Sequence, residues 1–172
     1  MPTIPRNQYT PYVSPPGAGT PASIRRFGTL IKVSADDTAG LYCVLEHTLA
    51  PETVAMPMHR HRRETKTFYA IEGKLSVQVG TNIVVAAPGT AVVIPAQTPH
   101  TFWNASDDKA VRFCAIIAPG GLERYYEEVA AVVPARGAPD MDAVLEISEK
   151  FGVEVDLLSL YDIIERHSVH LA

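Results

Sequence analysis

Two histidines in the segment MHRHRRETKTFYAIEG, residues 58–73, are the first candidates for chemistry. His59 and His61 are one residue apart in a strand-like run, and alternate residues of a β-strand face the same side. The two imidazoles therefore point together, while Arg60 points away. Two adjacent imidazoles can hold one divalent metal ion, although the same spacing also occurs as two ordinary surface histidines.

A third histidine, His100, lies in the segment GTAVVIPAQTPHTFWN, residues 89–104. Pro99 indicates a tight turn directly before it, and the residues after it read as a strand. The histidine is therefore expected at the start of that strand. Its spacing from the glycine, proline and asparagine residues of this segment is the reason to consider it together with the first pair.

The two segments together resemble the two motifs of the cupin superfamily. The first motif has two histidines one residue apart, then a glutamate, six further residues and a glycine. His59, His61 and Gly73 match this motif, and Lys66 stands in the glutamate position. The resemblance extends over residues 54–118.

The second cupin motif places a histidine between a proline and an asparagine at fixed spacings. Gly89, Pro95, His100 and Asn104 match it, and Gln97 stands where the family has glycine. The tail that follows is similar to the helical extension of quercetinase-like single-domain cupins.

This resemblance implies an all-β fold, a small jelly-roll barrel (double-stranded β-helix) with a C-terminal helical extension. In the family, three histidines and the glutamate project into the barrel and bind Fe, Mn, Ni, Zn or Cu. Carried over, His59, His61 and His100 are the expected ligands of a divalent transition metal. The glutamate does not carry over, because Glu64 lies two residues early. We expect Glu64 to be a solvated loop charge beside two arginines.

Lys66 decides whether the expected site holds a metal. A divalent ion and an ammonium about 4 Å apart repel by roughly 8 kcal/mol at an effective dielectric of about 20. Deprotonating a normal lysine at pH 7 costs about 4.6 kcal/mol. A lysine facing a bound metal should therefore be neutral or turn to another partner. Alternatively, no metal binds, and the ammonium group pairs with an anionic ligand or a carboxylate. We expect Lys66 to be catalytic, with a solvated, outward-turned side chain as the alternative.

Strand parity predicts the rest of the cavity wall. Phe68 shares the inward face with the lysine, Phe102 and Asn104 share it with the third histidine, and Met56 is placed to line the mouth. Small-molecule sites are usually apolar with few polar groups, so these four residues are the expected substrate contacts. Plain core packing is an equal alternative for the two phenylalanines. His47, on a neighbouring strand, is a weaker candidate.

Short strands separated by turn residues must position these side chains. Between residues 24 and 118 the separators are rich in Gly, Pro, Asn and Asp, a pattern typical of a sandwich or barrel. The expected strands are Phe27–Val33, Leu41–Leu49, Val54–His61, Thr67–Ile71, Leu75–Val79, Ile83–Ala86, Ala91–Ile94, His100–Asn104 and Val111–Ala118.

The chain changes character at both ends of this region. Residues 1–21 hold six prolines and predict an irregular arm. Residues 119–172 have helical composition and predict two or three helices, one of them with Asp140 as N-cap and Gly152 as C-terminal stop. The expected organisation is therefore the arm, a cupin barrel over residues 22–118, and the helical extension.

Composition excludes several classes of protein. The formal charge of −4 and the pI near 5.8 argue against a nucleic-acid groove, which needs a basic face. No apolar run has the length of a membrane span, and the N-terminus lacks the apolar core of a signal peptide, so we expect a cytoplasmic protein. Cys43 and Cys114 lie in apolar strands and are expected to be buried free thiols. We also expect a homodimer, as is common among single-domain cupins.

Three functions remain open at this level, since a fold does not fix a reaction. The first is a metal-dependent, dioxygenase-like enzyme that acts on a small phenolic or enolic substrate in the barrel. The second is a metal-free cyclase or isomerase in which Lys66 does acid–base work. The third is a non-catalytic cupin that binds a small molecule.

Overall fold

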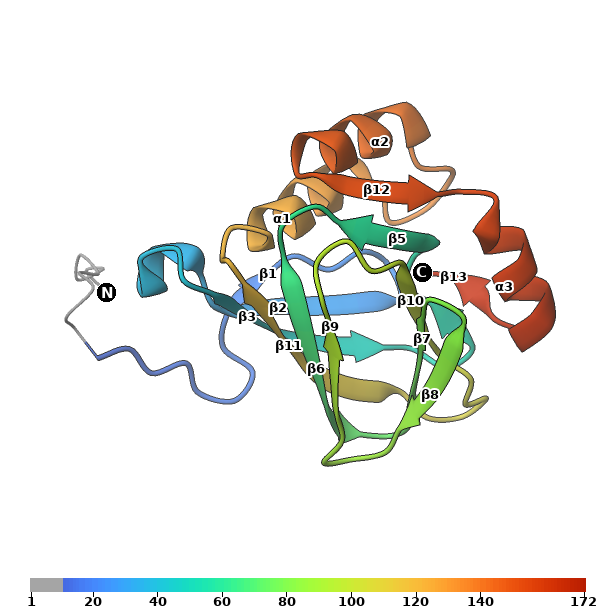
Figure 1. Cartoon of the computed structure of the whole chain (residues 1–172), viewed down its shortest axis with the longest axis horizontal. Coiled ribbons are helices and arrows are strands. Elements are labelled where there is room, and N and C mark those ends of the chain that lie inside the picture. Colours follow the sequence, from blue (N-terminus) through green and yellow to red (C-terminus); the bar gives the residue numbers. More distant parts are fainter. Residues whose placement is uncertain (1–10) are drawn as a thin grey trace.

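Two β-sheets face each other in the computed structural model, which describes residues 11–172 (Figure 1). The first sheet has the order β1-β2-β3-β11-β6-β9, and the second has the order β12-β5-β10-β4-β13, with β7 and β8 continuing from β10. Every strand pair is antiparallel except β13 with β4. This is the expected jelly-roll cupin fold with C-terminal helices.

The strands of the first sheet are β1 (Thr20–Pro21), β2 (Phe27–Val33), β3 (Cys43–Leu49), β6 (Thr65–Glu72), β9 (Ala91–Ile94) and β11 (Val111–Ala118). Those of the second sheet are β4 (Thr53–Val54), β5 (Met58–His61), β7 (Leu75–Val79), β8 (Asn82–Ala86), β10 (His100–Asn104), β12 (Val153–Asp156) and β13 (His170–Leu171). A short 3-10 helix, η1, spans Ala35–Thr38.

The strands form because apolar residues alternate with polar ones along them. In β11, Val111, Phe113, Ala115 and Ile117 are buried while the residues between them are half-buried or exposed. The expected strand from residue 54 to 61 is interrupted, so that β4 ends at Val54 and β5 begins at Met58. The single expected strand is therefore two separate strands. His59 and His61 are both in β5 and still lie on the same face of it.

The interior between the sheets is filled by aromatic side chains. Phe68 and Phe102 lie with ring centroids 5.0 Å apart, and Phe113 lies 5.2 and 5.5 Å from them. Phe27 closes the group at 5.6 Å from Phe102. These edge-to-face pairs stabilise the core beyond their buried area, so this part of the barrel is packed rather than open.

The extension holds α1 (Glu123–Val132), α2 (Met141–Lys150) and α3 (Ser159–His167). Asp140 accepts a hydrogen bond from the Ala143 amide at 3.1 Å, as expected for the N-cap of α2. Gly152 has a φ of +68°, the left-handed conformation that ends a helix. None of the helices within residues 11–172 is long and apolar enough to span a membrane.

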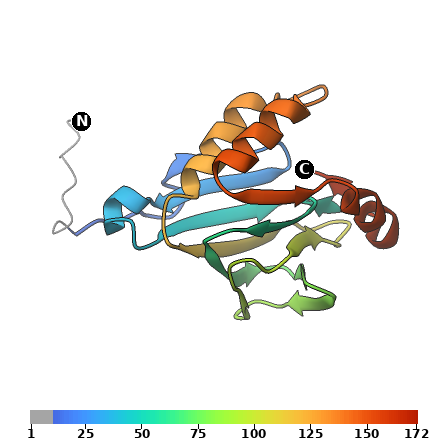
Figure 2. The ribbon, with the colours of Figure 1, turned by 45° about the horizontal axis from the view of Figure 1, so that its top comes forward.

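The extension is also part of the β structure, which the sequence analysis did not predict. β12 pairs with β5, and Val153 and Val155 lie opposite His61 and His59. α1 and α2 cover this end of the barrel together, while α3 lies beside the second sheet (Figures 1 and 2). The predicted N-terminal arm contributes β1 to the edge of the first sheet, and its first ten residues lie outside the described part of the chain.

The candidate metal centre

Three histidines meet between strands β5 and β10. His59 lies directly opposite His100 in the antiparallel register. His61 is two residues further along β5, on the same face of the strand. One nitrogen from each ring lies within 4.8 Å of the others, and each residue is at most 2% exposed. The structure therefore brings together the three side chains that the sequence motifs selected.

Hydrogen bonds fix the orientation of two of these rings. The Nδ1 atom of His59 lies 3.0 Å from the Pro57 carbonyl oxygen, and the Nδ1 atom of His100 lies 2.9 Å from the Thr98 carbonyl oxygen. A carbonyl only accepts, so Nδ1 carries the hydrogen in the neutral ring and Nε2 keeps its lone pair. Backbone carbonyls hold metal-binding histidines in this way.

The remaining ring nitrogens are buried without a protein partner. The Nε2 atoms of all three histidines, and Nδ1 of His61, make no hydrogen bond in the described structure. Buried polar atoms are normally paired, so unpaired lone pairs that converge indicate a missing ligand. Three neutral imidazoles fit a divalent transition metal.

Burial keeps these imidazoles neutral. It lowers the pKa of His100 to about 3 and holds the pKa values of His59 and His61 well below the ordinary 6.5. The positive charge of Lys66 lowers all three further. The rings are therefore in the form that binds a metal at neutral pH.

Lys66 lies inside the barrel, where it is 1% exposed. Its Nζ atom donates to the Tyr126 hydroxyl oxygen at 3.4 Å, so the partner is a phenol and not a carboxylate. Burial lowers the pKa of Lys66 from 10.5 to about 7. The solvated, outward-turned alternative is excluded for this side chain, and the amine is poised to exchange a proton near neutral pH.

Glu64 differs from the expectation of a solvated loop charge. It is half-buried, and its Oε2 atom is buried without a hydrogen-bond partner. Its negative charge raises the pKa of Lys66, which opposes part of the effect of burial. Glu64 is not one of the residues whose ligand atoms converge, so it acts on the lysine rather than on the histidine cluster.

Two further polar residues beside Lys66 come from elements that the cupin motifs do not include. Tyr126, on α1, is 3% exposed, and burial raises its pKa. His47, on β3, pairs through Nδ1 with the Thr29 hydroxyl at 3.0 Å and has an unpartnered Nε2. Burial lowers the pKa of His47 to about 3. In the sequence, Tyr126 fits only the apolar spacing of a helix, so the sequence did not predict its contact with Lys66.

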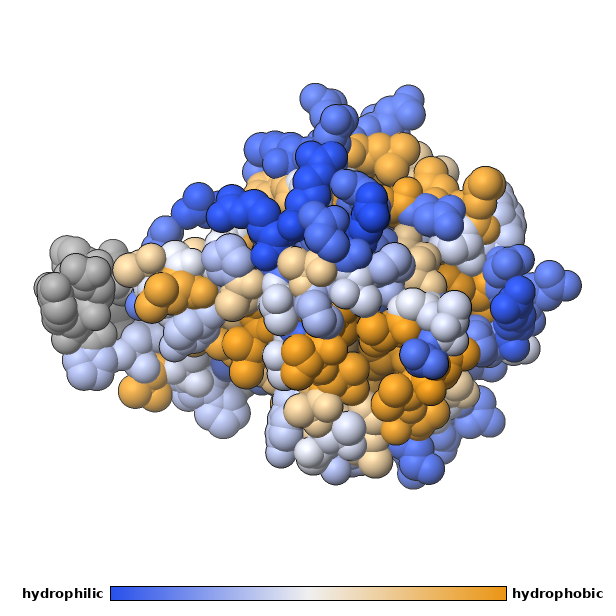
Figure 3. Space-filling model, in the orientation of Figure 1, coloured by the Kyte–Doolittle hydropathy of each residue, from blue (hydrophilic) through white to orange (hydrophobic). Residues whose placement is uncertain are grey.

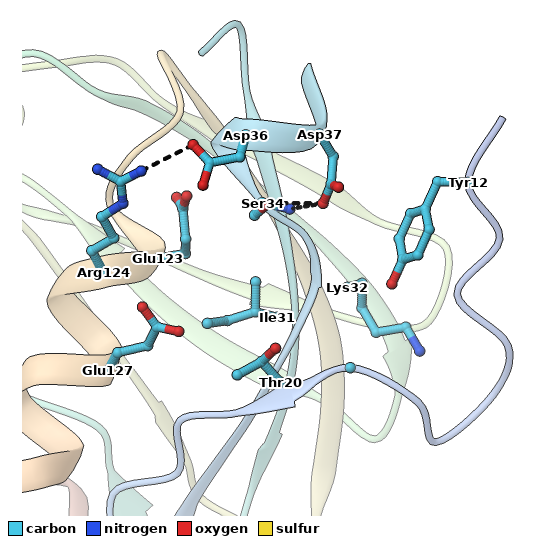
Figure 4. A pocket seen from close by; sticks show the side chains of 11 residues that line it. Tyr12, Thr20, Ile31, Lys32, Ser34, Asp36, Asp37, Glu123, Arg124 and Glu127 are labelled. Carbon is cyan, nitrogen blue, oxygen red and sulfur yellow. Dashed lines mark hydrogen bonds and ion pairs between the residues drawn. The ribbon is translucent and has the colours of Figure 1, made fainter. Parts of the chain in front are cut away.

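A buried carboxylate positions the helix that carries Tyr126. Glu123 accepts hydrogen bonds from the amides of Ala35 and Gly121, both at 2.8 Å (Figure 4 shows its surroundings). Arg124 pairs with Asp36 at 3.0 Å. These contacts tie the first turn of α1 to η1. They border a polar hollow, and the carboxylates of Glu123 and Asp36 are occupied in these contacts.

The four expected substrate contacts lie in different surroundings. Phe68 and Phe102 are in the aromatic core, each 1% exposed. Met56 is half-buried and lines an apolar cavity outside the barrel core. The Asn104 amide nitrogen donates to the carbonyl oxygens of Leu49, Ala50 and Lys109, and its oxygen accepts from the Ser106 amide. Asn104 therefore closes a turn, because its hydrogen-bonding capacity is already used.

Gln97 explains how the glycine position of the second motif is filled. Its φ is +65°, a conformation that favours glycine. Its amide donates to the His61 carbonyl at 2.8 Å, and its Nε2 atom donates to the Arg62 carbonyl at 2.8 Å. The side-chain bond offsets part of the strain, so the turn that leads to His100 is kept without glycine.

This turn gives a stability prediction. Gln97→Ala keeps the positive φ and loses the side-chain bond, and should destabilise the protein by about 1 kcal/mol. Gln97→Gly loses the same bond but relieves the strain, so it should be more stable than the alanine variant by about 1 kcal/mol. Urea unfolding of the three proteins measures both differences. A glycine variant less stable than the alanine variant would contradict this explanation.

Comparison with known proteins agrees with this geometry. Residues 45–117 match the cupin domain family. Comparison with curated proteins gave no match. These 73 residues hold the three histidines of the cluster and the two strands that carry them, and they support the cupin superfamily for this chain.

Solved structures with the same fold include three described as follows. KdgF from Halomonas sp. is 17% identical, with 58% of this chain and 84% of that chain covered and a TM-score of 0.51. Pac13 from Streptomyces, described as a nucleoside dehydratase, is 14% identical, with 67% of this chain and 88% of that chain covered and a TM-score of 0.54. A predicted oxalate decarboxylase from Thermotoga maritima is 16% identical, with 63% and 99% covered and a TM-score of 0.57. At these identities the likeness shows the fold alone.

Proposed function

We propose that this protein is a metal-dependent, dioxygenase-like cupin enzyme that acts on a small phenol or enol. The observation that carries the proposal is the convergence of unpartnered nitrogens from His59, His61 and His100 beside Lys66, whose pKa is lowered to about 7. A bound divalent metal would supply a Lewis acid and a coordination template there.

Lys66 supplies the proton chemistry in this proposal. Its neutral amine accepts the proton of the substrate O–H at Nζ, which leaves a phenolate or enolate next to an ammonium. The hydrogen bond to Tyr126 holds the amine in place for this transfer. Dioxygen is the co-reactant, and both of its atoms enter the product. The burial of Lys66 keeps water from the amine, which strengthens the ion pair.

A metal-free isomerase or cyclase is the second candidate. It is favoured by the same lowered pKa of Lys66, which suits a group that takes a proton from one substrate atom and returns it to another. In this case the three histidines would shape the pocket. The two candidates differ in which substitution removes activity.

Oxygen uptake tests the first candidate. The protein is loaded with Fe²⁺, Mn²⁺ or Ni²⁺ and supplied with a panel of phenols and enols. His61→Gln and Lys66→Met should each abolish substrate-dependent uptake, and Lys74→Met, at an exposed position, should not change it. Product formation without oxygen uptake, lost in Lys66→Met but kept in His61→Gln, would instead favour the metal-free enzyme. No turnover of any compound by any loaded form would count against both.

A homodimer is the assembly that we propose for this enzyme. Apolar side chains gather on the outer surface over β6, β8 and β9 (Figures 1 and 3). Tyr69, Val85, Val93 and Ile116 are each between 43% and 58% exposed. A surface patch of this kind commonly marks a protein interface. Light scattering at micromolar concentration should give twice the mass of the chain, and Val93→Glu should give the monomer. A wild-type monomer would refute the dimer.

A further inference from the structure

An apolar cavity of about 450 Å³ lies between the barrel and the helical extension. This volume is within the range of small-molecule sites. The barrel contributes Ile24, Phe27 and Met56 to its wall. The extension contributes apolar and aromatic side chains from its three helices, among them Tyr125, Tyr126, Met141, Val144 and Tyr161.

The wall of this cavity carries little free polarity. Among the described residues of the lining, Arg25 has the one charged side chain, and its guanidinium donates to the carbonyl oxygens of Pro134 and Gly137. The hydroxyls of Tyr125 and Ser148 lie 3.4 Å apart and pair with each other. A charged or strongly polar ligand would therefore lose its hydration without compensation, whereas an apolar one would not.

The cavity shares a wall with the candidate site. Tyr126 lines the cavity, and its hydroxyl oxygen accepts the hydrogen bond from Lys66 inside the barrel. Phe27 also lines the cavity, and its ring stacks on His47 with centroids 4.7 Å apart. An apolar ligand held here would have one end against Tyr126 and the reactive lysine behind it.

The outer rim of the cavity is apolar and accessible. Leu158 is 78% exposed and Tyr161 is 75% exposed, and both lie where the chain enters α3 or in its first turn. Met141, at the start of α2, is 37% exposed. The cavity therefore has an entrance between α2 and α3 that a hydrophobic molecule can use.

We propose that this cavity binds the apolar substituent of the substrate, so that the substrate is a neutral phenol or enol with an alkyl or aryl tail. This assignment rests on the proposed function for the reactive end of the molecule. The tail occupies the space under the helices, and the hydroxyl group lies toward Tyr126 and Lys66. The helical extension is then the element that selects the substrate.

Binding of 4-alkylphenols, from 4-ethylphenol to 4-octylphenol, tests the assignment by calorimetry on the metal-free protein. Each added methylene should tighten binding by about fourfold until the cavity is full. Val144→Trp and Met141→Trp fill the cavity and its rim, and each should weaken binding of the longer phenols by roughly tenfold or more. Leu41→Trp, at a position that is 71% exposed and outside both the cavity and the apolar patch of the proposed dimer, is the matched control and should bind like the wild type.

The outcomes separate this inference from the proposed function, because no metal or turnover is needed. Affinity independent of chain length, or unchanged in both tryptophan variants, would overturn the cavity assignment even if the protein is an active oxygenase. Met141 lies at the exposed rim, so Met141→Trp tests the cavity even if Val144→Trp does not fold. If affinity depends on the length of the alkyl tail but the protein never consumes oxygen, the cavity assignment would be supported and only the oxygenase proposal would be wrong.

Discussion

Replacing Lys66 with glutamate is expected to raise the affinity of the protein for Zn²⁺ by roughly 100-fold or more. The substitution removes a buried cation that repels the metal and supplies a carboxylate, which attracts it, in the position where the cupin motif has one. The buried position of Lys66 and its effect on the pKa of all three histidines place the change close to the site.

The measurement is competition with a chromophoric chelator at pH 7, with wild type and variant prepared alike. Lys74→Glu makes the same change of charge at an exposed position and should leave the affinity near that of the wild type. Lys66→Met should fall between the wild type and the glutamate variant, because it removes the repulsion without adding a ligand. An affinity unchanged by Lys66→Glu, with the fold intact, would show that position 66 does not act on the metal site.

Replacing Lys66 with methionine is expected to stabilise the metal-free protein by on the order of 3 kcal/mol near pH 6.5. The pKa of Lys66 falls from 10.5 to about 7 on folding. One pKa unit corresponds to about 1.36 kcal/mol of unfolding free energy. The substitution also removes the positive charge near the Glu64 carboxylate, which offsets part of the gain in stability. Methionine fills similar volume and has no charge to bury.

The pH dependence of this difference has a defined sign. Between pH 7 and 10.5 the unfolded chain binds a proton at Lys66 that the folded protein has released, so the wild type becomes more stable as the pH rises. The advantage of Lys66→Met should therefore be largest below pH 7 and shrink toward pH 9.5. Urea unfolding in a chelator at pH 6.5 and 9.5 measures it. A constant difference, or a less stable methionine variant at pH 6.5, would contradict a lysine that is buried at a cost.

The strands could be predicted from the sequence because turn residues and alternation act locally, and the resemblance to the cupin motifs added their jelly-roll arrangement. Most strands began and ended within two residues of the expected positions, since Gly, Pro, Asn and Asp mark the turns between them. Spacing along one strand predicted that His59 and His61 share a face, and the resemblance to the two cupin motifs added His100 to them.

The contributions of the extension could not be predicted, because they depend on long-range packing. β12 alternates apolar and acidic residues over only four positions, too short a run to predict a strand, and its pairing with β5 makes it one. Tyr126 reads as an ordinary apolar residue of a helix, and its contact with Lys66 depends on where Glu123 fixes that helix. The inward-facing position of Lys66 was predicted from strand parity, whereas its partner Tyr126 was not.

Equilibrium dialysis of the wild type and His61→Gln against Zn²⁺ tests the central claim most directly, namely that His59, His61 and His100 form one metal site. The wild type and His170→Gln, altered at an exposed histidine, should each retain roughly one ion per chain, and His61→Gln should bind roughly 100-fold more weakly. Equal binding by all three proteins, or no binding by the wild type, would contradict the account.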